Sequence, residues 1–306
     1  MTDIITEPCW RDGIASDDYH SGAICDGPSI SASGLKAIAL DCPAMFWMQS
    51  ALNPNREPKE TKALDFGKAA HALTLGEPTF DAEFVVSPFD AFTTKEARIW
   101  RDEQTRVIVR ESDLTTIRAM VAELKATPHV GRAFTNGIPE RSFFVKDKAT
   151  GVWLKARPDW FPSDPTQRFI VEYKTAASVR PDKFGYQAFE FGYHIQAALM
   201  LDVVEAVTGA KPLGIAHAVQ MKAAPYLADL QFFTADQIEH GRKAYRRALD
   251  TFAACWERHT AGKPERVAWP GYRTTPEPIL TPYSVAKKIA DEAEEDFNVT
   301  STRRAA

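Results

Sequence analysis

The sequence predicts an α/β (α+β) fold in which short strands and longer helices follow one another along the chain. Long segments with apolar residues at helical spacing predict helices at 113–126, 188–207 and 235–259. Short runs rich in β-branched and aromatic residues predict strands at 140–147, 152–157, 168–173, 213–221 and 227–233. Polar turns separate neighbouring strands, so we expect consecutive strands to pair as hairpins.

The length and composition are those of a soluble globular protein. The 306 residues suffice for one large domain or two, and 44% of them are hydrophobic and 25% charged. No apolar run approaches ~18 residues, and the first residues show no basic stretch followed by an apolar block. We therefore expect no membrane span, no signal peptide and a cytoplasmic location.

Charge and cysteine content exclude several kinds of site. The formal net charge is −4, so binding of a polyanion must depend on local basic patches and on a bound metal ion. The four cysteines are scattered without a C-x-x-C pair: Cys9, Cys25, Cys42 and Cys255. This spacing argues against a disulfide framework or a zinc site and favours free thiols.

Two short helices and a linker are predicted near the start of the chain. Ser31 or Ser33 is a candidate N-cap for a helix at 32–40, and an apolar helix follows at 44–51. The polar segment 53–62 predicts a linker.

The next helix, at 63–75, is rich in small residues that would let it approach a sheet closely. It contains His71, and a lone histidine on an apolar helix is either a satisfied core residue or a ligand. The charged segment 94–110 predicts a further helix, with either a solvated face or an arm that contacts phosphates. Ser112 is the candidate cap of the helix at 113–126.

Two helices and a tail are predicted in the last third. The helix at 188–207 contains Gln196, and Thr234 with Gln237 forms a capping box for the helix at 235–259. Basic residues lie close together near the start of this last helix, where they form either a phosphate-binding stripe or a solvated face: Arg242, Lys243, Arg246 and Arg247. The proline-rich and then acidic sequence of residues 271–306 predicts a peripheral tail.

Three charged residues converge in the hairpin whose turn lies at 162–165. Side chains alternate along a strand, so Glu172 and Lys174 point one way and Tyr173 points the other. The hairpin can bring Asp159 alongside that face. Two carboxylates repel unless a cation joins them, and oxygen ligands suit Mg²⁺ or Mn²⁺. The alternative is a salt-bridged surface hairpin without chemistry.

These residues belong to two short motifs, P-D and E-Y-K, separated by twelve residues. Together they resemble the signature of PD-(D/E)XK nucleases. Four further motifs occur in the order found in RecE-like (exonuclease VIII-like) enzymes: I-S-A-S-G-L-K, C-P-A-M-F, G-K-A-A-H and Y-H-I-Q-A-A. They also resemble RecB-type nuclease domains and lambda exonuclease. The resemblance covers residues 17–270, between an N-terminal arm at 1–16 and the tail. It implies a restriction-endonuclease-like core, a mixed central β-sheet flanked by helices.

The resemblance also implies roles for individual residues. His71, Asp159, Glu172 and the backbone carbonyl of Tyr173 would hold one or two Mg²⁺ or Mn²⁺ ions, and Lys174 would position the attacking water. Gln196 and Glu140 would lie near the metal and the DNA. Such families usually carry tyrosine four residues after the glutamine, where this chain has Met200. The basic residues expected to contact DNA are Lys155, Arg157, Arg242, Lys243 and Arg246.

The function implied is metal-dependent hydrolysis of linear double-stranded DNA, 5′→3′, in recombination of the phage or prophage type. Such enzymes form homo-oligomeric rings and work with a single-strand annealing protein. Some related nucleases hold an iron–sulfur cluster with one upstream and three downstream cysteines. This chain has the reverse distribution, so we expect no cluster. An endonuclease of the same superfamily and a catalytically silent DNA-binding or assembly module are the alternatives.

Overall fold

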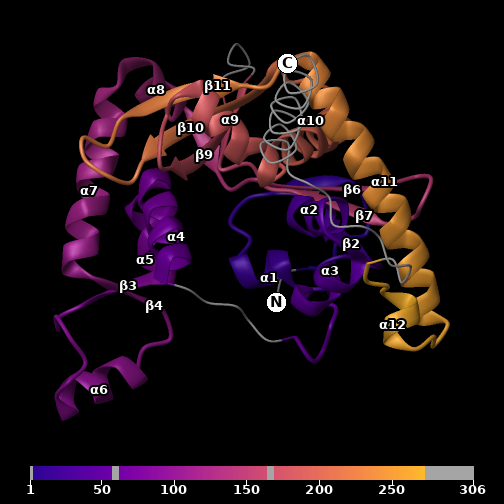
Figure 1. The fold of residues 1–306 in the computed structure, drawn as a ribbon, viewed down its shortest axis with the longest axis horizontal. Coiled ribbons are helices and arrows are strands. Elements are labelled where there is room, and N and C mark those ends of the chain that lie inside the picture. The colour runs from indigo at the N-terminus through magenta and orange to yellow at the C-terminus, as the bar shows by residue number, and fades with distance from the viewer. Residues whose placement is uncertain (1–2, 57–61, 164–168, 273–306) are drawn as a thin grey trace, which may run out of the picture. The chain divides into compact units, whose positions relative to one another are not determined.

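The computed structural model describes residues 3–56, 62–163 and 169–272 (Figure 1). The chain divides into two units, Met1–Gly271 and Tyr272–Ala306, and the helices and strands described here belong to the first. The predicted tail, apart from Gly271 and Tyr272, lies outside the described residues, as do part of the linker at 53–62 and part of the turn at 162–165. No helix in the described part of the chain is long and apolar enough to cross a membrane.

The strands within the described residues form three sheets. The largest has the order β11-β10-β9-β8-β5, in which β9 and β10 are parallel and the other pairs antiparallel: β5 (Gly137–Pro139), β8 (Trp160–Pro162), β9 (Phe169–Ala176), β10 (Gly214–Met221) and β11 (Ala228–Phe232). The second has the order β1-β6-β7-β2: β1 (Cys9–Arg11), β2 (Ser29–Ser31), β6 (Ser142–Lys146) and β7 (Trp153–Ala156). The third pairs β3 (Phe84–Ser87) with β4 (Val107–Arg110).

Twelve helices lie within the described residues. Five shorter ones connect the larger elements: α1 (Ser16–His20), α3 (Pro43–Gln49), α5 (Glu77–Glu83), α8 (Pro128–Ala133) and α12 (Glu265–Ala268). The others form the bulk of the helical layers: α2 (Ala32–Leu40), α4 (Lys62–Leu75), α6 (Lys95–Asp102), α7 (Glu111–Ala126), α9 (Pro181–Glu190), α10 (Tyr193–Thr208) and α11 (Ala235–Thr260). Mixed sheets flanked by helices confirm the predicted fold class.

Two hydrophobic cores lie on opposite faces of the five-stranded sheet. On one face, Ile170 of β9 and Ile215 of β10 pack with α2, α10 and α11 in a core that also includes β6 and β7. On the other face, Val171 and Tyr173 of β9 pack with α4 and α7. Figure 1 shows the two groups of helices on either side of β9 and β10. Because side chains alternate along a strand, β9 contributes to both cores.

A bent hairpin connects the two larger sheets. One arm consists of β5 and β6, and the other of β7 and β8. β6 pairs with β7 in the four-stranded sheet, and β5 pairs with β8 in the five-stranded sheet. At the bend, Glu140 has a left-handed backbone (φ 51°), and its N–H donates to the carbonyl oxygen of Asp159 at 3.2 Å. The strand predicted at 152–157 therefore pairs with β6, and the antiparallel partner of β9 is the short β8. The proposed hairpin of 152–157 with 168–173 is wrong in that detail.

Two predicted helices are interrupted. The helix at 188–207 is two helices, α9 and α10, because Gly192 between them adopts a left-handed backbone (φ 65°) that ends one and begins the other. The helix at 94–110 stops at Asp102, and its last residues form β4. The N-cap of α7 is Arg110 rather than Ser112. By contrast, the Thr234–Gln237 capping box is present as predicted.

We predict that Gly241→Ala destabilises the protein. Gly241 on α11 faces α10 so closely that an added Cβ would overlap the backbone carbonyl of His194. Overpacking of this kind costs about 1–3 kcal/mol, which urea denaturation would detect as a lower free energy of unfolding. Gly185→Ala on α9 is the matched control, since its added Cβ meets nothing within 4 Å. There we expect a gain of about 0.5–1 kcal/mol, and equal effects at both positions would contradict the close approach.

Candidate active site

Glu172 and Lys174 lie on the same face of β9. The Glu172 side chain is fully buried, and the Lys174 side chain is 15% exposed, with its Nζ 2.8 Å from Glu172 Oε2. Tyr173 points to the opposite face, where its hydroxyl donates to Gln220 Oε1 at 2.8 Å. The strand alternation predicted from the sequence is thus present, and it directs the acid–lysine pair toward α10.

Asp159 lies beside this pair because the chain bends between β7 and β8. The backbone N–H of Tyr173 donates to Asp159 Oδ2 at 2.7 Å, and the backbone N–H of Asp159 donates to Glu172 Oε1 at 3.3 Å. These two bonds fix the carboxylates in adjacent positions. His71 reaches the same place from α4, with its Nε2 2.9 Å from Asp159 Oδ1.

Gln196 completes the contacts of Glu172. It lies in the first turn of α10, and its Nε2 donates to Glu172 Oε2 at 2.7 Å. The left-handed Gly192 at the N-cap sets the start of α10 and therefore the position of this amide. Glu172 Oε2 accordingly accepts from both Lys174 and Gln196.

Burial and neighbouring charges shift the pKa values of the four ionisable side chains at this site: His71, Asp159, Glu172 and Lys174. Burial and the adjacent Asp159 raise the pKa of Glu172, against the opposing effect of Lys174. Burial also acts to raise the pKa of Asp159, but His71 and Lys174 outweigh it and hold the pKa below its ordinary value. For His71 and Lys174, burial lowers the pKa and the neighbouring carboxylates reverse this, so both pKa values lie above their ordinary values. Each carboxylate therefore depends on the cations beside it.

A polar cavity of about 190 Å³ opens beside these groups. Asp159, Gln196 and Glu140 all line it, and burial raises the pKa of the Glu140 carboxyl. Met200, at the position where the resembling families carry tyrosine, lines the same cavity. Asp159, Gln196 and Glu140 thus share one cavity, and Glu172 and His71 contact these lining residues from behind.

Two of the basic residues predicted to contact DNA form walls of this cavity. The Lys155 Nζ is buried and donates to the backbone carbonyl of Tyr19 at 2.7 Å. The Arg157 guanidinium lies 4.0 Å from the centroid of the Tyr19 ring and donates to Ser142 Oγ. Burial lowers the pKa of Lys155 to about 8. Both side chains therefore hold α1 against the sheet, and their contacts with DNA stay a prediction.

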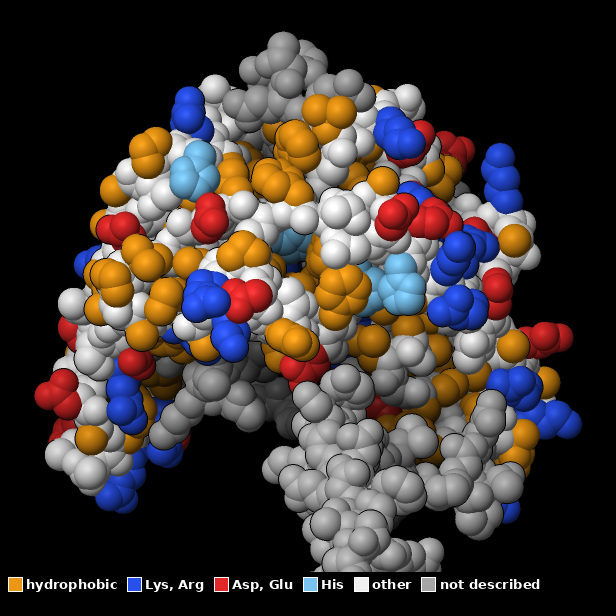
Figure 2. All heavy atoms as spheres, turned by 45° about the horizontal axis from the view of Figure 1, so that its top comes forward, with side chains coloured by type: hydrophobic (Ala, Val, Ile, Leu, Met, Phe, Trp, Pro, Cys, Tyr) orange, Lys and Arg blue, Asp and Glu red, His pale blue; other side chains and the backbone are white. Residues whose placement is uncertain are grey.

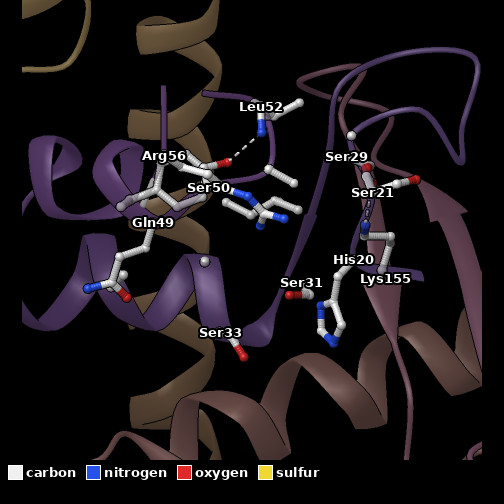
Figure 3. Close-up of a pocket in the computed structure, with 16 residues that line it drawn as sticks. His20, Ser21, Ser29, Ser31, Ser33, Gln49, Ser50, Leu52, Arg56 and Lys155 are labelled. Atoms are coloured by element: carbon white, nitrogen blue, oxygen red, sulfur yellow. Dashed lines mark hydrogen bonds between the residues drawn. The ribbon is translucent and has the colours of Figure 1, made fainter. Parts of the chain in front are cut away.

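A second cavity of about 230 Å³ shares His20, Ser31, Ser33 and Lys155 with the first. Sequence interpretation missed most of its lining, which is rich in hydroxyl groups and includes Ser21, Ser29, Ser50, Gln49 and Arg56. In Figure 3 the Arg56 guanidinium points into the space between the loop after α3 and the segment that carries Ser31 and His20. The local signal for this cavity is the motif I-S-A-S, which carries the two candidate N-caps and is part of the RecE-like resemblance.

The basic residues of α11 lie in a different setting. Arg242 donates to both carboxylate oxygens of Asp202 and to Glu239, and Arg246 pairs with Asp147 at 2.6 Å. Lys243 is exposed. On the face shown in Figure 2, Lys and Arg side chains are interspersed with Asp and Glu rather than gathered in one patch. DNA contacts by Arg242, Lys243 and Arg246 stay a prediction.

The donors at this site suit a divalent ion by their chemistry. Asp159 and Glu172 supply carboxylate oxygens, each with two lone pairs, and His71 supplies an imidazole nitrogen. Within residues 3–56, 62–163 and 169–272, however, no three His, Cys, Asp or Glu side chains are already arranged to hold a metal ion. In the arrangement seen here His71 contacts Asp159 instead. All four cysteines are free.

Comparisons with known proteins identify a family and a similar fold. The family described as "PDDEXK-like domain of unknown function (DUF3799)" matches residues 31–267. A crystal structure of a candidate exonuclease from Eubacterium rectale superposes with a TM-score of 0.56 at 16% sequence identity, covering 88% of this chain and 96% of that one. At this identity the likeness concerns the fold. A search of curated proteins found no match.

Proposed function

Because the chain belongs to the DUF3799 family of PDDEXK-like domains, we propose that it is a metal-dependent nuclease that hydrolyses DNA phosphodiesters. The observation that carries this proposal is the convergence of Asp159, Glu172 and Lys174 beside a polar cavity. A salt-bridged surface hairpin, the alternative from sequence, would not bury Glu172 completely. His71, which contacts Asp159, comes from α4, far away in sequence.

In this proposal Asp159, Glu172 and His71 hold one or two Mg²⁺ or Mn²⁺ ions, with the carbonyl of Tyr173 as a further ligand. A bound divalent ion supplies Lewis acidity, which makes hydroxide available near neutral pH and offsets charge on the phosphate. The backbone N–H groups of Tyr173 and Asp159 keep the two carboxylates in fixed orientations. Gln196 holds Glu172 Oε2 from the other side.

Lys174 and Glu140 take the remaining roles. The Lys174 ammonium, held at Glu172, positions the attacking water and stabilises negative charge that develops on the phosphate oxygens. Glu140 lines the cavity beside Asp159 and contributes a carboxylate near the reacting phosphate.

We further propose that the enzyme is RecE-like and acts on the ends of double-stranded DNA, in the 5′→3′ direction. The second cavity supports a preference for ends. Its hydroxyl groups and Arg56 are donors suited to a terminal phosphate, and it adjoins the cavity that contains Asp159. Ring-shaped oligomers, an annealing-protein partner and a place in phage-type recombination belong to the same proposal.

We predict that Arg56→Met removes the preference for phosphorylated ends. The wild-type protein should digest a 5′-phosphorylated linear duplex about 10-fold faster or more than an unphosphorylated one, since a charge-assisted hydrogen bond contributes about 1.5–3 kcal/mol. The variant should digest both at similar, lower rates. Time courses of end-labelled duplex measure this, and Lys263→Met, on the exposed turn after α11, is the control. Equal wild-type rates on both ends would contradict the terminal-phosphate assignment.

The two alternatives differ in simple assays. An endonuclease of the same superfamily would also cut covalently closed circular duplex, which an end-dependent enzyme leaves intact. A silent DNA-binding or assembly module would bind DNA and release no nucleotides with any divalent ion.

A further inference from the structure

Lys36 lies on the side of α2 that borders the active site. Ser33, one turn earlier on the same helix, lines both cavities. Residues three apart on a helix share a face, so Lys36 follows Ser33 toward the start of α10. Its aliphatic stem packs against the backbone of Gly192, the N-cap of α10: a Cβ added there would be 3.2 Å from Lys36 Cγ.

Lys36 and Lys174 approach the same aromatic ring. The Lys36 Nζ is 5.4 Å from the centroid of the Tyr193 ring, and the Lys174 Nζ is 5.2 Å from it. Such contacts between a cation and an aromatic face are attractive and hold the ammonium groups in place. Tyr193 therefore connects the predicted catalytic lysine to a second lysine from a different helix.

The charge of Lys36 lacks a carboxylate partner. It forms no ion pair or hydrogen bond with another residue in the described part of the chain, whereas Lys174 is paired with Glu172. Burial, and then repulsion by Lys174, lowers the pKa of Lys36 to about 8, with only partial compensation from Glu172. A half-buried cation beside another cation opposes folding. We therefore expect an apolar side chain of similar length to be at least as stable here, and the unpaired ammonium is available to an anion from outside the protein.

We propose that Lys36 is a second cationic residue of the active site, which contacts a phosphate of the bound DNA strand next to the scissile bond. This inference rests on the proposed nuclease function. Both ammonium groups lie within 5.4 Å of the centroid of the same Tyr193 ring, so a DNA strand bound at Lys174 would bring a phosphate near Lys36 and supply the negative charge that this ammonium lacks. Lys36 would then contribute to substrate binding and stabilise the negative charge that develops at the scissile phosphate.

The first test compares Lys36→Met, Lys36→Arg and Lys148→Met with the wild-type protein. Lys148 is an exposed lysine in the β6–β7 turn, at the end of β7 away from Asp159, and serves as the matched control. We expect Lys36→Met to lower kcat/KM for DNA hydrolysis by about 10–100-fold, while Lys36→Arg keeps most activity and Lys148→Met keeps all of it. The melting temperature of Lys36→Met should be unchanged or higher.

The second test measures DNA binding in EDTA, where the strand stays intact. A protein cation that contacts one phosphate contributes about 0.9 to the slope of log K against log salt concentration. We therefore expect this slope to become less steep by about 0.9 in Lys36→Met and to stay the same in Lys148→Met.

Three outcomes would overturn the inference, and they are distinguishable. An active wild-type protein with unchanged kcat/KM and salt slope in Lys36→Met would exclude Lys36 alone. Loss of activity in step with a lower melting temperature would assign Lys36 a structural role. A wild-type protein that releases no nucleotides from DNA would reject the nuclease proposal and this inference with it.

Discussion

The Lys174→Met variant is expected to hydrolyse DNA about 10²–10³-fold more slowly than the wild-type protein, as is found when one charge-stabilising donor is removed from an active site. Lys174 Nζ lies 2.8 Å from Glu172 Oε2 and beside Asp159. Methionine keeps the length of the side chain and removes the charge. The initial rate of nucleotide release from linear duplex, at saturating divalent ion, measures the effect.

The same substitution is also expected to lower stability, which must be separated from the loss of chemistry. Glu172 is fully buried, so removing Lys174 leaves a buried carboxylate without its cation, at a cost of about 3–5 kcal/mol. The double variant Lys174→Met/Glu172→Gln removes both charges and should recover most of the stability without recovering activity. A Lys174→Met protein that digests DNA at the wild-type rate would rule out the assigned role of the lysine.

The Asp159→Asn variant is expected to lose both divalent-ion binding and hydrolysis. The substitution keeps the size of the side chain and removes the negative charge that faces His71 and Lys174. Changing a residue that only orients a metal ligand already weakens binding by about 10–100-fold, so loss of a ligand should weaken it by at least about 100-fold. Calorimetric titration with Mn²⁺ measures the affinity directly and needs no substrate.

Asp250→Asn serves as the control, because Asp250 is an exposed carboxylate on α11. It should leave both the Mn²⁺ affinity and the hydrolysis rate unchanged. If Asp159→Asn bound Mn²⁺ as tightly as the wild-type protein does, Asp159 could not be a ligand of the catalytic ion.

The arrangement on β9 could be predicted because it depends on strand geometry alone. A period of two places Glu172 and Lys174 together and Tyr173 opposite, wherever the strand lies in the fold. The position of Asp159 beside Glu172 could be predicted from the reversal of the chain before β9, although the strand that precedes Asp159 belongs to another sheet. His71 and Gln196 were found through the family resemblance, since neither spacing nor composition relates them to β9.

Other features depend on contacts between distant segments and left little local signal. The bend that moves the chain from one sheet to the other is centred on Glu140. Glutamate seldom adopts a left-handed backbone, so the sequence does not predict a bend at this residue. Gly192 breaks the predicted long helix, but a glycine within a helical pattern does not by itself indicate a break. Asp202 and Asp147, which pair with Arg242 and Arg246, lie 40 and 99 residues earlier, so the sequence of α11 could show only the local pair of Arg242 with Glu239.

The central claim is that the site around Asp159, Glu172 and Lys174 hydrolyses DNA with a divalent ion. The most direct measurement is nucleotide release from 5′-phosphorylated linear duplex by the wild-type protein and by Asp159→Asn, each with Mg²⁺, with Mn²⁺ and with EDTA. Our account predicts release by the wild-type protein with Mg²⁺ or Mn²⁺, none in EDTA, and none by the variant under any condition. Release that persists in EDTA or in Asp159→Asn, or a wild-type protein inactive with both ions, would contradict it.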